Sequence, residues 1–395
     1  MRQNVIFIPG GYWQFETIKK LKKNNPINSI VIDDNSHAVG KKLSDFEIKI
    51  KSNKYNKIRA FLKQRKIKDY IILSLFSDFG LKVKNKLSIK SKININYNLF
   101  INKYIFRSIL RKNNISNILF LKANNIKNLP KNKKFILKPV YGSGSKNVKK
   151  IKDKSFLYKE LLKIKKKQNY LIEEYFDGIE YATDGFVYKN KVIFYYIAQK
   201  EKTKKSNYLV AHLYKQNNLN IKNSLKIKSL ISRSLKFLNY NFGPFHAEFL
   251  FNKKINKFHI IEIHPRGAGY DVGSKFIKKI SGTDLQQLEL NYLLGREIKF
   301  NDFLPKIKYK NFCIRFLPID KSGKIKSLGF KKFKISNNIH VIKKIFYKKG
   351  SEIKNGVDDS HRLCYLMLFS NNKKTNLVKK SENILKKYFQ IKYYE

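Results

Sequence analysis

Two strand-like runs within Phe245–Gly273 constrain this chain more than any other feature of its sequence. The runs, 245–251 and 258–264, flank a polar turn, and residues two apart on a strand share one face of the sheet. A hairpin that closes about its midpoint therefore places Glu248 opposite Glu262, with the side chains about 5 Å apart. Carboxylates at that separation repel each other unless a proton or a cation lies between them. A divalent metal with oxygen ligands is the simplest resolution, so this face is predicted to hold a cation.

Two histidines on the same face leave the identity of that cation open. The same pairing places His246 opposite His264, and a face with imidazoles and carboxylates would also suit zinc. The simplest expectation for His246 is that it packs or forms hydrogen bonds within the hairpin.

Composition indicates a globular protein with an unusual excess of positive charge. Its 395 residues suffice for about two or three domains with their own cores. Hydrophobic residues make up 42% and aromatic residues 14%, which excludes a disordered chain. A formal net charge of +57 is typical of proteins that bind nucleic acid. The lysines are nevertheless spread along the whole chain, which favours a compositional origin, and nucleic acid is not expected as a partner.

Cysteine usage and hydropathy favour a soluble cytoplasmic protein. Cys313 and Cys364 lack metal-type spacing, so free thiols in a reducing compartment are expected. The apolar burst Val5–Ile8 is shorter than the core of a signal peptide. No apolar run approaches the roughly 20 residues needed to span a bilayer, so no membrane partner is expected.

The N-terminal part alternates strands with helical segments. Strands are predicted over 4–8, 29–32 and 70–75, with a helix over 14–23, and this alternation is typical of a parallel sheet. Gly10-Gly11 follows the first strand, but the full G-x-G-x-x-G spacing is absent and no dinucleotide site is expected. This part of the chain is instead predicted to help form a substrate pocket.

Basic residues suited to phosphate occur in two further stretches. Lys103 and Arg107 are four residues apart and share one face of a predicted helix, for which an exposed basic face is the simplest interpretation. Lys138 ends an apolar strand, and a point charge there suits phosphate. The loop Gly142-Ser143-Gly144-Ser145 lets backbone N–H groups approach phosphate oxygens closely. It is not a P-loop, since no Gly-Lys-Ser/Thr follows it, and a plain hairpin turn would look the same.

A strand–turn–strand segment presents carboxylates that could meet a purine nucleoside. The strand 170–176 is apolar except for Glu173 and Glu174, and Glu180 opens the next alternating strand. Such an edge can offer backbone groups and carboxylates to a purine and its ribose. Surface carboxylates without a ligand are the alternative interpretation of Glu173 and Glu180.

The remaining segments complete the expected architecture. The Lys-rich segment 200–226 is predicted to form a mobile loop over the site. Gly323 is predicted to lie in a hairpin turn, and no catalytic group is expected beyond about residue 300. The other expected elements are a helix over 227–239, a core helix over 281–295 with Thr283 or Asp284 as its N-cap, strands over 313–319, 325–330 and 362–369, and a helix over 377–388.

In combination these stretches resemble the ATP-grasp superfamily of carboxylate–amine and carboxylate–thiol ligases. The similarity rests on order and spacing: a basic residue before the core, Lys-Pro-x-x-Gly-Ser-Gly, Glu-x6-Glu, and paired Glu strands ending in Glu-Ile-x-Pro-Arg. It implies a combined α/β and α+β fold with two lobes that clamp ATP. The implied parts are a preceding parallel, Rossmann-like α/β domain over 1–98, an ATP-grasp core over 99–300 and a C-terminal α+β lobe over 301–395.

The resemblance also implies a role for each motif residue. Those implied to bind the nucleotide are Lys103 and Lys138 at the phosphates, Gly142, Ser143, Gly144 and Ser145 closing over them, Glu173, Glu174, Tyr175 and Phe176 near adenine, and Glu180 at the ribose. Those implied to act on metal and substrate are Glu248, Glu262 and His264 at Mg²⁺, Arg266 at the substrate carboxylate or tetrahedral intermediate, and Tyr270 and Asp271 in a substrate loop, where Asp271 would meet an amino group.

One position departs from the pattern of the superfamily. Many members carry asparagine where this chain has His264. Because Mg²⁺ prefers oxygen ligands, the imidazole either lies outside the coordination shell or makes a second metal site that is weak or prefers Mn²⁺.

The implied function is ATP-dependent ligation. A carboxylate attacks the γ-phosphate of ATP to give an acylphosphate, and an amine then displaces phosphate, as in amino-acid ligases and carbamoyl-phosphate-synthase-like members. This chemistry depends on positioning and charge neutralisation rather than on a protein nucleophile. Small-molecule carboxylates and amines are the expected partners, and a homodimer the expected assembly. The alternatives are a biotin-carboxylase-like or purine-biosynthetic ligase using bicarbonate or formate, and a nucleotide- or nucleic-acid-binding protein without enzymatic activity.

Overall fold

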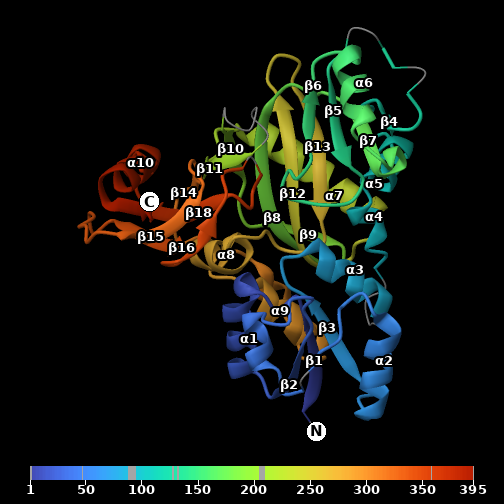
Figure 1. Ribbon diagram of the computed structural model, residues 1–395, viewed down its shortest axis with the longest axis vertical. Coiled ribbons are helices and arrows are strands. Elements are labelled where there is room, and N and C mark those ends of the chain that lie inside the picture. Colours follow the sequence, from blue (N-terminus) through green and yellow to red (C-terminus); the bar gives the residue numbers. More distant parts are fainter. Residues whose placement is uncertain are drawn as a thin grey trace.

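A computed structural model describes residues 2–46, 48–87, 95–126, 129–130, 133–203, 210–356 and 358–394. The chain forms an N-terminal lobe, a small and a large central sheet, and a C-terminal lobe beside the large sheet (Figure 1). The predicted combination of a parallel N-terminal sheet with α+β architecture further along the chain is confirmed.

A three-stranded parallel sheet in the order β2-β1-β3 forms the centre of the N-terminal lobe, as predicted. The elements of this lobe are β1 Gln3–Ile8, α1 Tyr12–Asn24, β2 Ile27–Val31, α2 Tyr55–Gln64, β3 Tyr70–Ser74 and α3 Asp78–Leu87. The inner strand β1 is apolar on both faces because helices cover both sides, and Val5 and Ile6 are fully buried. Helix α3 begins at Asp78, where the strand β3 has just ended.

A small antiparallel sheet in the order β4-β7-β5-β6 carries the glycine-rich loop. The elements around it are α4 Asn98–Ile101, α5 Lys103–Lys112, β4 Phe120–Lys122, β5 Phe135–Pro139, β6 Lys149–Ile151, α6 Lys154–Leu162 and β7 Tyr170–Glu174. Helix α5 begins at Lys103 because the side chain of Asn102 accepts hydrogen bonds from the N–H groups of Tyr104 and Ile105.

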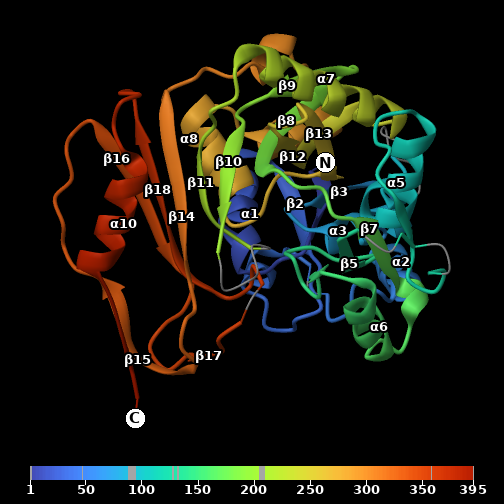
Figure 2. The ribbon, with the colours of Figure 1, turned by 90° about the horizontal axis from the view of Figure 1, so that it is seen from above.

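Among the described residues, the large sheet has nine strands, and it runs in the order β13-β12-β8-β10-β11-β14-β18-β16, with β9 paired to β8. Its strands are β8 Ile179–Tyr188, β9 Lys191–Phe194, β10 Ala198–Lys202, β11 Ala211–Gln216, β12 Phe242–Asn252, β13 Lys257–His264, β14 Asn311–Pro318, β16 Ile339–Ile345 and β18 Arg362–Ser370. Seen from above, its strands β14, β16 and β18 lie on the side of the C-terminal helix α10, away from the small sheet (Figure 2). Since β14, β16 and β18 extend this sheet past residue 300, the predicted domain boundary there stays a prediction.

The segment 200–226 contains more regular structure than expected. Strands β10 and β11 pair with each other antiparallel, so the prediction of one mobile loop is wrong for these residues, while 204–209 lie outside the described residues. Helix α7 spans Ile221–Phe237 and begins earlier than predicted.

The predicted helix over 281–295 corresponds to α9, and a separate short helix, α8, precedes it. Helix α8 covers Ile277–Ser281 and α9 covers Leu285–Leu293. Gly282 between them adopts a left-handed conformation with φ of 75°, which favours glycine and ends α8. The side chain of Asp284 accepts a hydrogen bond from the Gln287 N–H at 3.3 Å, so Asp284 is the N-cap of α9, one of the two residues predicted for that role.

The predicted hairpin turn at Gly323 is wrong. Strand β14 pairs with β11 and β18 in the large sheet, whereas β15, Gly323–Phe330, pairs with β17 and β19 in a separate sheet. A Cβ at Gly323 would lie 2.9 Å from the ring of Tyr393 on β19, so glycine permits close strand packing there. The other elements of this lobe are β17 Glu352–Ile353, α10 Leu377–Tyr388 and β19 Phe389–Tyr393, and the bounds of α10 are those predicted.

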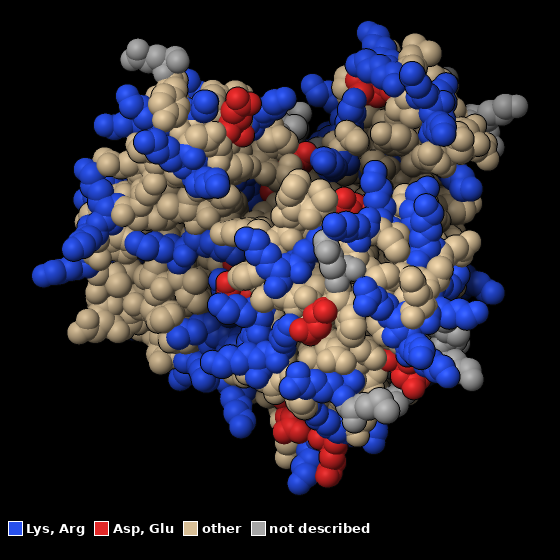
Figure 3. Space-filling model, turned by 60° about the horizontal axis from the view of Figure 1, so that its bottom comes forward, with Lys and Arg blue, Asp and Glu red and all other residues tan. Residues whose placement is uncertain are grey.

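Charge and apolar surface agree with the expectations from composition. Lys and Arg side chains are scattered across the whole face seen in Figure 3, and they gather in no single stripe there. The thiols of Cys313 and Cys364 are free and buried. Within the described residues, no helix combines the length and apolarity needed to cross a membrane.

Candidate functional site

The hairpin of β12 and β13 has the predicted register. Glu248 lies opposite Glu262 and His246 opposite His264, and a register shift follows directly after Glu248. The side chains of Glu248 and Glu262 retain 18% and 19% of their exposure, so both carboxylates remain accessible.

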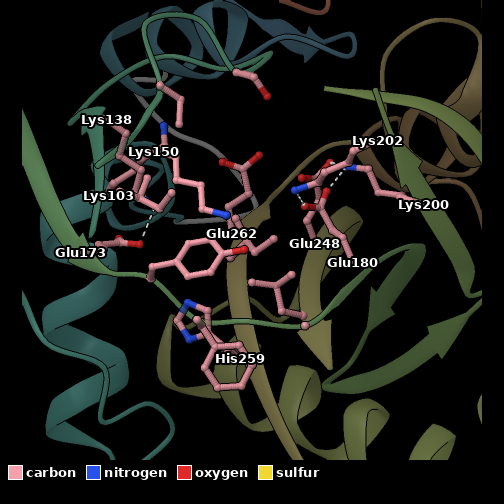
Figure 4. A pocket seen from close by; sticks show the side chains of 18 of the residues that line it. Lys103, Lys138, Lys150, Glu173, Glu180, Lys200, Lys202, Glu248, His259 and Glu262 are labelled. Atoms are coloured by element: carbon pink, nitrogen blue, oxygen red, sulfur yellow. Dashed lines mark hydrogen bonds and ion pairs between the residues drawn. The ribbon is translucent and has the colours of Figure 1, made fainter. Parts of the chain in front are cut away.

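A cavity of about 400 Å³ lies between the small sheet and the hairpin. Figure 4 shows Lys103, Lys138 and Glu173 on its small-sheet side, and Glu180 and Glu248 across from them. The residues predicted to bind nucleotide or metal that line it are Lys103, Lys138, Gly142, Ser143, Gly144, Ser145, Glu173, Glu174, Tyr175, Phe176, Glu180, Glu248 and Glu262. The fold thus brings together stretches far apart in sequence, although the role of each residue stays a prediction.

A buried triad of charges fixes Lys138 in this cavity. The carboxylate of Glu173 lies 2.7 Å from Nε of Arg107 and 2.7 Å from Nζ of Lys138. The Arg107 guanidinium also donates hydrogen bonds of 2.6 Å to the carbonyls of Ile260 and Ile261 on β13, which joins the two sheets. The expectation of an exposed basic face is therefore wrong for Arg107, which is 1% exposed. The Glu173 carboxylate contacts both cations, and its predicted role near adenine stays a prediction.

The resemblance implies that Lys138 binds phosphate, and nucleotide affinity is then expected to fall above pH 8. Burial lowers the pKa of Lys138 to about 8, although the Glu173 carboxylate acts in the opposite direction. The lysine is cationic below that pH and loses its charge as pH rises, so ADP affinity should drop by up to about tenfold per pH unit. Calorimetric titration with ADP between pH 7 and 9.5 measures this. Lys138→Arg, which stays charged, should flatten the profile, and a flat profile for the unsubstituted protein would contradict the role of Lys138.

Two lysines that sequence reasoning missed complete the opposite wall. Lys200 contacts Glu180 and lies 2.8 Å from Glu248, and Lys202 contacts Glu180 from the same strand (Figure 4). Burial alone would lower the pKa of Lys200, but the carboxylates of Glu180 and Glu248 raise it well above its ordinary value. The sequence pattern that could have identified these lysines is the alternation of Lys200, Glu201 and Lys202 on one strand. The prediction of a loop over this segment left that pattern unused.

His246 forms hydrogen bonds, as the simplest expectation for it predicted. Its Nδ1 lies 3.0 Å from Asp184 on β8 and its Nε2 lies 3.3 Å from Glu248. Burial lowers the pKa of His246, but the carboxylates of Asp184 and Glu248 outweigh it and bring the pKa to about 9. Asp184 is fully buried and also accepts a hydrogen bond of 2.8 Å from the Ala268 N–H, so it links the hairpin to the loop that follows.

Asp78 from the N-terminal lobe holds the end of the hairpin. Its Oδ1 accepts a hydrogen bond of 2.6 Å from Nε of Arg266 and lies 3.0 Å from Nδ1 of His264. The other imidazole nitrogen, Nε2, lies 2.9 Å from Glu262. Burial raises the pKa of Asp78, but the Arg266 guanidinium and the His264 imidazole hold it well below its ordinary range. The orientation of Arg266 therefore depends on a residue nearly 190 positions away.

The donor set of the hairpin fits Mg²⁺. The described contacts of Glu248 and Glu262 use Oε1 of each carboxylate, so within the described part of the chain Oε2 of each is available to an oxygen-preferring cation. Among the residues that the structure describes, no group of three or more His, Cys, Asp or Glu is arranged to hold a metal. Since both ring nitrogens of His264 lie near carboxylates, its role as a ligand stays a prediction.

A second cavity of about 910 Å³ adjoins the first at Glu248, Glu262 and the glycine-rich loop. His264, Arg266 and Tyr270 line it, as does the segment Asp358–Arg362, although no site residue was predicted so far along the chain. In a lysine-rich sequence, an Asp-Asp pair and one arginine carry no local signal of a site.

The carboxylate of Asp271 contacts other side chains of the protein and faces neither cavity. Its Oδ2 lies 2.9 Å from Nζ of Lys344 and accepts a hydrogen bond of 2.7 Å from the hydroxyl of Tyr365. The carboxylate is 3% exposed and lines neither cavity, so the contact predicted between Asp271 and a substrate amino group has no support in this geometry.

Fold and site together define a two-lobed protein whose basic residues and facing carboxylates enclose a cavity. Residues 131–274 match the family model of the ATP-grasp domain, which confirms the predicted resemblance. No curated protein matches the chain significantly in sequence.

Solved structures with the same fold are distant in sequence. The L-amino acid ligase from Bacillus licheniformis has 17% identity and a TM-score of 0.77, with 100% of this chain and 99% of that chain covered. Phosphoribosylglycinamide synthetase from Anaerococcus prevotii has 16% identity and a TM-score of 0.76, with both chains covered to 100%. The biotin carboxylase domain of Hydrogenobacter thermophilus 2-oxoglutarate carboxylase, solved with MgADP and bicarbonate, has 13% identity and a TM-score of 0.71, with 99% and 91% covered. At these identities the likeness shows the fold alone.

Proposed function

We propose that this chain is an ATP-dependent ligase that activates a carboxylate as an acylphosphate and joins it to an amine. The observation that supports it best is the junction of the two cavities. Glu248 and Glu262 line both, with Lys103 and Lys138 on one side and Arg266 on the other. Such a junction suits a reaction between a triphosphate held in one cavity and an acid held in the other.

Each group has a defined task in this proposal. Lys103 and Lys138 bind the phosphates of ATP, and Glu248 and Glu262 hold Mg²⁺, which neutralises phosphate charge when bound. Arg266, oriented by Asp78, binds the substrate carboxylate in the second cavity. An oxygen of that carboxylate attacks the γ-phosphorus, and the bond to the bridging oxygen breaks to release ADP. The amine then attacks the acyl carbon, and phosphate leaves with the acyl C–O bond pair and takes up the proton that the amine nitrogen loses.

Activation of bicarbonate is the second candidate. Its support is the likeness of the whole fold to a biotin carboxylase domain solved with MgADP and bicarbonate. Phosphate release that depends on bicarbonate, and on no organic acid, would favour it over the first candidate. For either candidate function, we also propose small-molecule substrates as partners, a cytoplasmic location and a homodimer.

The purified chain is expected to release phosphate from ATP and Mg²⁺ when the correct acid and amine are present. Pools of organic acids and amino acids, offered in pairs, allow the reaction to be found by phosphate release and the product by mass spectrometry. Calorimetric titration with MgADP provides a parallel measure of the nucleotide site. Intact MgADP binding without phosphate release from any pool would contradict the ligase assignment, and absence of MgADP binding would contradict the nucleotide site itself.

A further inference from the structure

The C-terminal lobe contacts the glycine-rich loop directly. The backbone N–H of Asp359 donates a hydrogen bond of 3.2 Å to the carbonyl of Gly144. A Cβ added at Gly144 would lie 3.5 Å from the Cβ of Asp359, so a side chain at this position would meet Asp359. Both segments line the second cavity, and the loop also lines the first.

The segment Asp358–Arg362 is itself held firmly. The hydroxyl of Tyr270 donates a hydrogen bond to the carbonyl of Asp359. The Arg362 guanidinium donates to the Asp359 carboxylate and, at 2.8 Å, to the carbonyl of Ala211 on β11. It also stacks over the ring of Phe316 at 3.9 Å from its centroid and over the ring of Tyr270 at 4.6 Å. Arg362 is 4% exposed, so it is a buried anchor rather than a surface charge.

The glycine-rich loop is fastened from the other side as well. Nζ of Lys103 donates a hydrogen bond to the carbonyl of Gly142, and the amide of Asn102 donates at 2.8 Å to the hydroxyl of Tyr141. The loop therefore lies between helix α5, which carries Lys103, and the segment anchored by Arg362. Its position over the first cavity depends on the C-terminal lobe as well as on its own sheet.

We propose that Asp358–Arg362 is a latch that holds the glycine-rich loop closed over the nucleotide cavity, with Arg362 as its positioning residue. The nucleotide part of this inference rests on the proposed function, in which the loop covers the phosphates. Because the latch also lines the second cavity, a substrate there touches the segment that fixes the loop. Binding in the second cavity is thereby coupled to closure over the first.

Two substitutions in the full chain test the latch. Tyr270→Phe removes only the hydroxyl bonded to Asp359, and Arg362→Met removes the charge while keeping an unbranched chain against the rings. Hydrogen–deuterium exchange of the Asp359 amide, which donates to the Gly144 carbonyl, should quicken about fivefold in either variant of the nucleotide-free protein, which corresponds to the loss of about one net hydrogen bond. MgADP affinity, measured by calorimetry, should fall by a similar factor. Arg362→Lys keeps the charge but not the planar guanidinium, so its exchange rate and MgADP affinity should lie between those of the unsubstituted protein and Arg362→Met.

Tyr70→Phe is the matched control. Its hydroxyl donates a hydrogen bond of 3.0 Å to the carbonyl of Leu87 in the N-terminal lobe, so it loses the same chemical group away from both cavities. Exchange of the Asp359 amide should be unchanged in this variant. Unchanged exchange there in Tyr270→Phe would overturn the latch, as would equal quickening in the control. These two exchange results test the latch even if MgADP fails to bind the unsubstituted protein. That failure would count against the proposed function alone.

Discussion

Glu262→Gln is expected to lower turnover at least about 100-fold while the protein still folds. Burial raises the pKa of Glu262, but the His264 imidazole outweighs it and brings the pKa to about 2, so the side chain is anionic at neutral pH. Glutamine keeps the size of the side chain and an oxygen near His264, but it removes the anionic ligand. The side chain is 19% exposed and lines both cavities, so its charge contributes more to the site than to the core.

The magnesium dependence of ADP binding measures this loss without knowledge of the substrate. Mg²⁺ should strengthen ADP binding to the unsubstituted protein relative to EDTA, and Glu262→Gln should abolish most of that difference. Glu382→Gln is the control, since it removes the same charge from the exposed face of α10, where Glu382 pairs with Lys386. Full turnover, or an unaltered magnesium effect in Glu262→Gln, would contradict the metal assignment.

Periodicity and local chemistry predicted the parts of the fold that are determined locally. The register of the hairpin followed from closing it about its midpoint, and strand alternation then placed Glu248 and Glu262 on one face. The bounds of α10 are those predicted, and the side chain of Asn376 caps the helix by accepting the Lys379 N–H. Strands β1 to β3 followed from short apolar runs between helical segments.

Contacts between distant residues carry no such signal. Arg107 and Glu173 are 66 positions apart, so a charged residue that ends buried in a triad looks the same in sequence as one on a basic surface. Asp78, Asp184 and Lys200 were not predicted as site residues for the same reason. A single lysine is also hard to distinguish in a chain with 85 lysines and arginines. Gly323 was misread because turn chemistry is local, whereas the sheet to which a strand belongs is decided by packing.

Glu173→Gln is expected to lower the free energy of unfolding by about 3–5 kcal/mol, because breaking a buried ion pair leaves uncompensated charge. The Glu173 side chain is 5% exposed and lies between Arg107 and Lys138, and glutamine neutralises neither. Lys138 can avoid its share of this energetic cost by losing its proton. Burial has already lowered its pKa to about 8, and Glu173→Gln removes the carboxylate that opposes this shift. Arg107 cannot deprotonate, so most of the loss remains there.

Glu174→Gln, one residue further along, is the matched control. Its pair with Lys133 has an N–O distance of 2.6 Å but side chains that are 28% and 46% exposed, so its loss should cost below about 1 kcal/mol. Urea unfolding at pH 7 measures both variants. Burial raises the pKa of Glu173, but Arg107 and Lys138 hold it well below its ordinary value. The stabilisation is therefore complete above about pH 5 and is lost as pH falls through the folded pKa, so Glu173→Gln should also flatten the acid limb of the stability profile. Equal losses in the two variants would mean that the triad stabilises the fold no more than a surface pair does.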